Sequence, residues 1–107
     1  MQLKATEKDI QKVILEWLTL KKYFCWRNNT GATPFQKKGG GNYFVRYGLV
    51  GSGDILGLTK TGRFFSIEVK APGKKPTESQ LNFMQAINEN GGLAFTAHCL
   101  NDVEIKL

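Results

Sequence analysis

The stretch GSGDILGLTKTGRFFSIEVKAPG (residues 51–73) decides the fold of this chain. Residues 55–59 form a short apolar run that predicts a strand, and a turn with Gly62 available for positive φ separates it from a second strand at 64–71. Side chains alternate along the second strand, with Phe65, Ile67, Val69 and Ala71 on one face and Ser66, Glu68 and Lys70 on the other. The pattern predicts a hairpin with one core face and one polar face that is a candidate site.

The rest of the chain predicts helices and strands around this hairpin. The expected elements are a helix from about 7 to 21 capped by Thr6, a strand at 23–27, a helix from Thr77 to about Asn90, a strand at 93–100 and a short element at 103–107. Residues 28–53 form a long glycine-punctuated connection in which only 43–47 has a strand pattern, and connections of that length are usually functional or mobile. The order predicts an α/β fold with a small mixed β-sheet flanked by helices in three layers.

Size and composition predict one intracellular domain. The 107 residues fit a single domain (1–107), with so little core to spare that an oligomer interface could belong to the fold. We expect no membrane span and no signal peptide, because no apolar run is long enough and the N-terminus MQLKATEKD lacks an apolar region. For Cys25 and Cys99 we expect two buried thiols in a reducing cytosol, with a disulfide or a thiolate metal site as alternatives.

Charge is concentrated in the middle of the chain. Between Lys21 and Lys75 there are eleven Lys or Arg residues and two acids, Asp54 and Glu68, in a chain of net charge +6. A segregated positive excess favours a polyanion such as nucleic acid, although a solvated charged surface explains a modest excess anywhere.

The two acids also predict a metal site. Glu68 and Lys70 lie about 6–7 Å apart on one face of their strand, and the hairpin can bring Asp54 beside Glu68. Close carboxylates resist joint ionisation unless a hard dication such as Mg²⁺ binds both. Lys70 could then orient water or stabilise charge on phosphorus, and the Val69 carbonyl could complete the coordination. The alternative is a solvent-facing Glu68–Lys70 pair and a turn aspartate.

These residues resemble a known nuclease motif. Asp54, thirteen residues and then Glu68-Val69-Lys70 look like the PD-(D/E)xK motif, with Gly53 where the motif has proline. The wider pattern, which covers nearly all of the chain, resembles the virus-type replication-repair nuclease (VRR-NUC) family: Glu7 in an early helix, WRNN (26–29), GSGDILG (51–57), IEVKAPG (67–73) and Gln80. The resemblance implies a restriction-endonuclease-like fold similar to Holliday-junction resolvases. It also implies a Mg²⁺- or Mn²⁺-dependent, structure-specific, homodimeric DNA endonuclease, and it allows a phage or prophage source.

Gln80 and Glu7 each have two explanations. Thr77 and Gln80 have capping-box spacing, and Glu7 at a helix start interacts favourably with the helix dipole. Both residues also head the apolar stripes of their helices, and the resemblance assigns both to the catalytic site. His98, the only histidine, is distant from the motif in sequence, and we expect it to be structural.

Two groups of basic residues are candidates for DNA binding. Lys74 and Lys75 directly follow the motif strand, and Lys37, Lys38 and Arg46 are interleaved with aromatic residues in the long connection. Solubility alone is the alternative. Our hypothesis is a metal-dependent endonuclease that acts on branched DNA such as Holliday junctions or flaps. The alternatives are a non-catalytic nucleic-acid-binding module and a restriction-type duplex nuclease.

Overall fold

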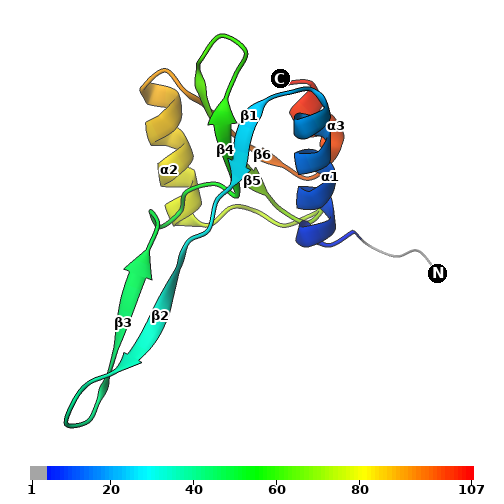
Figure 1. Ribbon diagram of the computed structural model, residues 1–107. Helices are drawn as coiled ribbons and strands as arrows, with labels where there is room; N and C mark the ends of the chain where they lie inside the picture. Colours follow the sequence, from blue (N-terminus) through cyan, green and yellow to red (C-terminus); the bar gives the residue numbers. More distant parts are fainter. Residues whose placement is uncertain (1–4) are drawn as a thin grey trace.

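A four-stranded mixed sheet forms the centre of the fold. The computed structural model describes residues 5–107. Residues 1–4, which belong to the N-terminal segment in which we expect no signal peptide, lie outside the described residues. The strand order is β1-β4-β5-β6 (Figure 1). These strands are β1 (Phe24–Arg27), β4 (Ile55–Leu58), β5 (Phe64–Val69) and β6 (Leu93–Ala97).

The pairing of β5 fixes where the candidate site lies. β4 and β5 form the predicted antiparallel hairpin, with Ile55 opposite Ile67. β5 and β6 are parallel, with Glu68 opposite Thr96. The carboxyl ends of two parallel strands meet at one edge of a sheet, so the residues that follow Val69 and Ala97 are neighbours.

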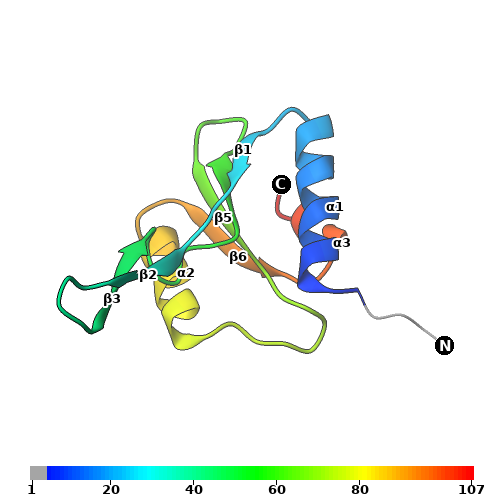
Figure 2. The same ribbon diagram turned by 60° about the horizontal axis from the view of Figure 1, so that its bottom comes forward.

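Helices cover both faces of this sheet. Figures 1 and 2 show α1 (Glu7–Leu20) and α3 (Leu100–Glu104) on one face and α2 (Glu78–Glu89) on the other. This confirms the predicted three-layer α/β fold. The core lies between α1 and the sheet, where the buried residues include Ile10, Ile14, Leu18, Ile55, Phe65, Ile67 and Val69. None of the helices in residues 5–107 is both long and apolar enough to cross a membrane.

Several local predictions are wrong. The alternative in which Glu68 faces solvent is wrong, because α2 packs over β5 and β6 and leaves Ser66 and Glu68 buried. The helical spacing of apolar residues also predicts Leu81 on the apolar face of α2, but Leu81 is 53% exposed. The strand expected at 93–100 ends at Ala97, and the terminal element is α3, which begins at Leu100. Cys99 is exposed instead of buried, and neither cysteine forms a disulfide within residues 5–107.

The long connection at 28–53 contains a second sheet. β2 (Gly31–Gln36) and β3 (Asn42–Tyr47) pair antiparallel, and the hairpin extends away from the sheet and helices (Figure 1). The sequence predicted most of β3 but not β2, because Gly31 and Pro34 disfavour a strand. Three glycines with positive φ, Gly39, Gly40 and Gly41, make the turn between the strands. We call residues 31–47 the arm and the rest of the fold the body.

Candidate active site

Asp54 and Glu68 meet at the carboxyl end of β5. The backbone N–H of Asp54 donates to the Ile67 carbonyl at 2.9 Å, which continues the β4–β5 ladder by one residue. The side chain of Asp54 then accepts a hydrogen bond at Oδ2 from the Val69 N–H at 2.7 Å. The hairpin therefore holds the Asp54 carboxylate against the strand that carries Glu68, as the sequence predicted.

Burial and Asp54 together change the ionisation of Glu68. Glu68 is only 4% exposed. Burial first, and then the charge of Asp54 and a hydrogen bond between the two side chains, raise the pKa of Glu68 to about 8, while the Lys70 ammonium opposes this rise. In the absence of a cation, this pKa of about 8 favours the protonated form of Glu68 at neutral pH.

Gln80 joins α2 to this pair. Its Oε1 accepts from the Thr77 N–H at 2.8 Å, which completes the capping box at the start of α2. Its Nε2 donates to Glu68 Oε1 at 2.8 Å. The same amide therefore completes the helix cap and contacts Glu68. Because the cap occupies the amide oxygen, the NH₂ group is the end that faces Glu68.

Lys70 and Glu7 lie at the same edge of the sheet. The charges of both side chains affect the pKa of Glu68, with Lys70 lowering it and Glu7 raising it. Glu7 Oε1 accepts a long hydrogen bond of 3.5 Å from the Ala71 N–H, so the first turn of α1 approaches the residue after Lys70. The structure thus brings Asp54, Glu68, Lys70, Gln80 and Glu7 together.

His98 is closer to this edge than its sequence position suggests. It follows β6, and its Nδ1 lies 3.3 Å from the Ala71 carbonyl oxygen. Its backbone N–H donates to Asp102 Oδ2 at 2.8 Å. These contacts fix the loop beyond β6 and fit a structural role.

Asn28 is a positioning residue to which the sequence analysis gave no role. Its Nδ2 donates to Ser52 Oγ at 2.7 Å and to the Gly53 carbonyl at 2.9 Å, and its backbone N–H donates to the Asp54 carbonyl at 2.8 Å. Three bonds from one residue therefore fix the backbone that enters Asp54. Asn28 belongs to the WRNN stretch (26–29), which is part of the sequence pattern that resembles the VRR-NUC family.

The glycine at position 53 has a steric cause. Gly53 is buried, and a Cβ at this position would overlap Ser66 Oγ and lie 2.9 Å from the Ile67 carbonyl oxygen. The Ser66 hydroxyl is itself buried without a hydrogen-bond partner among the described residues. Neither proline nor any other side chain fits at position 53 unless Ser66 and the backbone at Ile67 both move, which explains the departure from the motif.

The donor set fits a hydrated magnesium ion better than a closed metal site. Within residues 5–107, no group of three or more His, Cys, Asp or Glu side chains is arranged to hold a metal. The paired carboxyl groups of Asp54 and Glu68 remain, with the backbone of Val69 directly beside them. Mg²⁺ is commonly held by one or two carboxylates while it keeps several waters, and zinc prefers four protein ligands in structural sites.

The basic residues lie in three places. Lys37 and Lys38 are at the turn of the arm, which lies far from the sheet that carries the carboxylates (Figure 1), whereas Arg46 is near the end of β3 that adjoins the body. Lys74 and Lys75 are exposed in the loop that follows the site, where the Lys74 N–H donates to the Ala71 carbonyl at 3.0 Å.

Lys60 and Arg63 have structural partners at the opposite end of the sheet. Lys60 Nζ donates to the carbonyls of Lys21 and Lys22, and Arg63 donates to those of Gly91 and Gly92. Some of the eleven basic residues between Lys21 and Lys75 therefore stabilise the fold instead of forming a docking surface.

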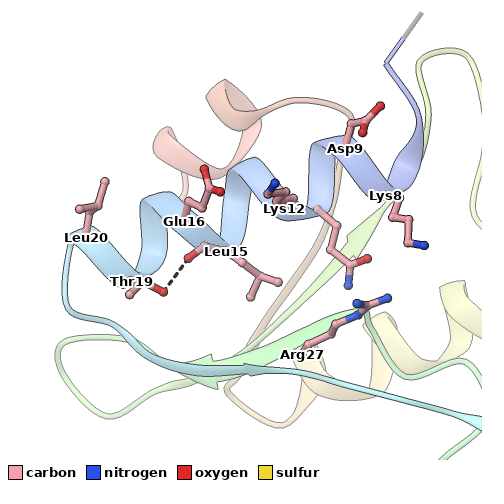
Figure 3. A pocket seen from close by; sticks show the side chains of 9 residues that line it. Lys8, Asp9, Lys12, Leu15, Glu16, Thr19, Leu20 and Arg27 are labelled. Carbon is pink, nitrogen blue, oxygen red and sulfur yellow. Dashed lines mark hydrogen bonds between the residues drawn. The ribbon is translucent and has the colours of Figure 1, made fainter.

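A groove between α1 and β1 contains none of the predicted site residues. It is open, has a volume of about 710 Å³, and Arg27 reaches beneath the helix from β1 (Figure 3). Its lining residues are Lys8, Asp9, Gln11, Lys12, Leu15, Glu16, Thr19, Leu20 and Arg27. Both signs of charge are mixed there, so this groove shows no preference for a polyanion.

Comparison with protein families agrees with the geometry. The VRR-NUC domain matches residues 5–100, which include every side chain of the site and the whole arm. No curated protein matches the chain closely enough to count as a relative. The match spans most of the 107 residues and identifies a nuclease-type family. The chain therefore belongs to the VRR-NUC domain family.

Proposed function

We propose that this chain is a Mg²⁺- or Mn²⁺-dependent endonuclease that hydrolyses phosphodiester bonds in branched DNA. The observation that supports it most strongly is the buried Glu68 carboxyl group, which lies beside Asp54, has its pKa raised to about 8 by burial and by the charge of Asp54, and accepts a hydrogen bond from Gln80. A hard dication can replace the proton of Glu68 and remove the repulsion between the carboxylates. The choice of branched DNA rests on the family resemblance.

The residues of the site divide into metal ligands and supporting groups. Asp54, Glu68 and the Val69 carbonyl would hold the metal, which when bound acidifies water and polarises a phosphoryl oxygen. Lys70 would stabilise the negative charge that develops on the phosphate. Gln80 and Glu7 would orient Glu68 and the end of β5 through the contacts described above.

DNA would contact the chain at two distances from the site. Lys74 and Lys75 follow the site directly and would hold phosphates near the cleaved bond. Lys37, Lys38 and Arg46 on the arm would hold phosphates farther along the duplex. A homodimer would present two such sites to opposing strands of a four-way junction.

The test compares labelled four-way junction, flap, duplex and single-stranded DNA in Mg²⁺, Mn²⁺ or EDTA. We expect junction or flap cleavage only with metal, and a loss of about 10³-fold or more in Glu68→Gln, since metal-assisted charge stabilisation is worth several kcal/mol. Binding of DNA by this variant should be unchanged or tighter. The matched control is Glu89→Gln, because Glu89 is exposed at the other end of α2 and should not affect cleavage.

Three outcomes would contradict the proposal. Cleavage that persists in EDTA or in Glu68→Gln would refute the site. DNA binding without cleavage under any metal condition would identify a non-catalytic binding module. Cleavage of plain duplex that depends on base sequence would identify a restriction-type nuclease.

A further inference from the structure

The two strands of the arm have no supporting layer. Among the described residues, neither β2 nor β3 packs extensively against any helix or strand except the other. Every residue of both strands is exposed. A two-stranded hairpin alone is at best marginally stable in water. The arm therefore lacks a surface that would cover one of its faces.

The register separates the arm into two unlike faces. Residues directly opposite each other in an antiparallel pair share a face. One face carries Thr33, Phe35, Tyr43, Val45 and Tyr47, and the other carries Ala32, Pro34, Gln36, Asn42, Phe44 and Arg46. We call the first the uncharged face. On it the rings of Phe35 and Tyr43 stack with their centroids 5.6 Å apart.

The uncharged face and the base of the arm together expose an apolar area as large as the largest patch on a typical monomer. Its four large apolar side chains, with Leu49 and Val50 at the base of the arm, are each between 42% and 66% exposed. At roughly 200 Å² for a fully exposed aromatic side chain, the exposed total is on the order of 500 Å². Apolar patches of this size mark interaction sites, and a standard interface buries about 800 Å² per partner.

Charge distinguishes between DNA and a second copy of the chain as the partner of the uncharged face. DNA attracts cations, and the cations of the arm lie elsewhere, with Arg46 on the opposite face and Lys37 and Lys38 at the turn. A two-fold interface places the same patch of both subunits together. The uncharged face can pair with itself without repulsion, whereas the opposite face would bring two copies of Arg46 together.

We propose that the uncharged face of the arm is a two-fold interface with the same face of a second copy of this chain. Pairing covers the apolar ladder of each hairpin and leaves Arg46 and the turn lysines directed outward, free for a polyanion. The interface specifies how the dimer in the proposed function is built, and it is tested without DNA or cleavage.

The experiment is analytical ultracentrifugation of the free protein over a wide concentration range. The wild type should sediment as a dimer. Val45→Lys (Val45 is 46% exposed) places a charge on the uncharged face, and Phe44→Lys (Phe44 is 67% exposed) places the same charge on the opposite face, one residue away. Like charges that meet across an interface cost several kcal/mol. We therefore expect Val45→Lys to raise the dimer Kd about 10²-fold, and Phe44→Lys to leave it unchanged.

A disulfide assay gives a second, independent measurement. In a Cys99→Ser background, Val45→Cys should form an intermolecular disulfide on oxidation, and Phe44→Cys should not. A wild type that remains monomeric at all concentrations, or lysine variants that dimerise equally, would overturn the proposal. If Val45→Lys tightens binding of junction DNA without changing sedimentation, the uncharged face contacts DNA and the interface is wrong. Both substitutions lie on the exposed arm and outside the core, so the far-ultraviolet circular dichroism of the two variants should show the same folded body.

Discussion

Strand β5 and the arm are both built from alternating residues, yet the body covers β5 on both faces and leaves the arm uncovered. Five of the six residues of β5 are buried between α1 and α2, whereas all twelve strand residues of the arm are exposed. Burial raises the pKa of Glu68 and fixes its bond to Gln80. The body thus supplies a fixed carboxylate pair in which Glu68 is buried, and the arm supplies reach, positive charge and apolar surface.

The same substitution in the two regions should separate chemistry from DNA binding. Lys70→Met removes the ammonium beside Glu68 and should lower the cleavage rate about 10²–10³-fold, a loss typical of a group that stabilises transition-state charge. Lys38→Met at the arm turn removes one phosphate contact and should weaken DNA binding severalfold, with the slope of log K against log salt reduced by about 1. Single-turnover cleavage and binding titrations at several salt concentrations measure both.

The salt concentration provides the control for the Lys70→Met and Lys38→Met variants. Low salt should restore cleavage by Lys38→Met, because it strengthens the remaining phosphate contacts. It should not restore Lys70→Met. If low salt rescues both variants, Lys70 binds DNA and has no role in the reaction.

A glycine in each region tests how closely each is packed. Gly53→Ala forces a methyl group against Ser66 Oγ and should lower the free energy of unfolding by about 1–3 kcal/mol, the usual cost of overpacking. Gly40 has φ 108° with nothing within 4 Å of an added Cβ, so Gly40→Ala should strain only the arm turn and leave the unfolding midpoint of the body unchanged. Urea titration followed by tryptophan fluorescence measures both.

The cause of the Gly53 effect can be isolated with a second substitution. Ser66→Ala removes the hydroxyl that the methyl group would overlap, so the double variant Gly53→Ala/Ser66→Ala should be more stable than Gly53→Ala alone. Recovery should be partial, because the Ile67 carbonyl also lies 2.9 Å from the added Cβ. Additive effects of the two substitutions would show that this contact does not explain the glycine.

Sequence periodicity predicted the body well and the arm poorly, for a physical reason. Alternation in 64–71 and the capping boxes at Thr6 and Thr77 are local signals, and the structure has a strand and two capped helices there. The arm has no buried face that would impose a regular alternation, and residues 31–36 include a glycine and a proline. A periodic pattern of apolar residues arises where the same chain buries one face of an element, and the chain buries neither face of the arm.

Within the site, the sequence identified residue types but not the bonds that orient them. Asp54, Glu68, Lys70 and Gln80 could be selected from spacing and resemblance. The three bonds of Asn28 to the loop before Asp54 depend on a contact about 25 residues distant, which no local pattern encodes. The burial of Glu68 was also missed, because it depends on where α2 packs.

The last effect we predict is a pH dependence of stability that belongs to the body alone. The pKa of Glu68 is raised from 4.5 to about 8, so between these pH values the folded chain holds a proton that the unfolded chain releases. In the absence of metal, the stabilising effect of this group is complete below about pH 4.5 and is lost as pH rises to about 8. Thermal unfolding midpoints measured in EDTA at a series of pH values should therefore decrease across this window.

Substitution and metal separate this effect from the other carboxylates. Glu68→Gln cannot release the proton and should remove this part of the slope, whereas Glu89→Gln, at the exposed end of α2, should keep it. Mg²⁺ binds only the ionised pair, so it should stabilise the wild type more at pH 8 than at pH 6 and oppose the slope. The arm has no carboxylate between residues 31 and 47 and cannot contribute. A slope unchanged in Glu68→Gln would mean that the proton is held elsewhere and that the paired-carboxylate description of the site is wrong.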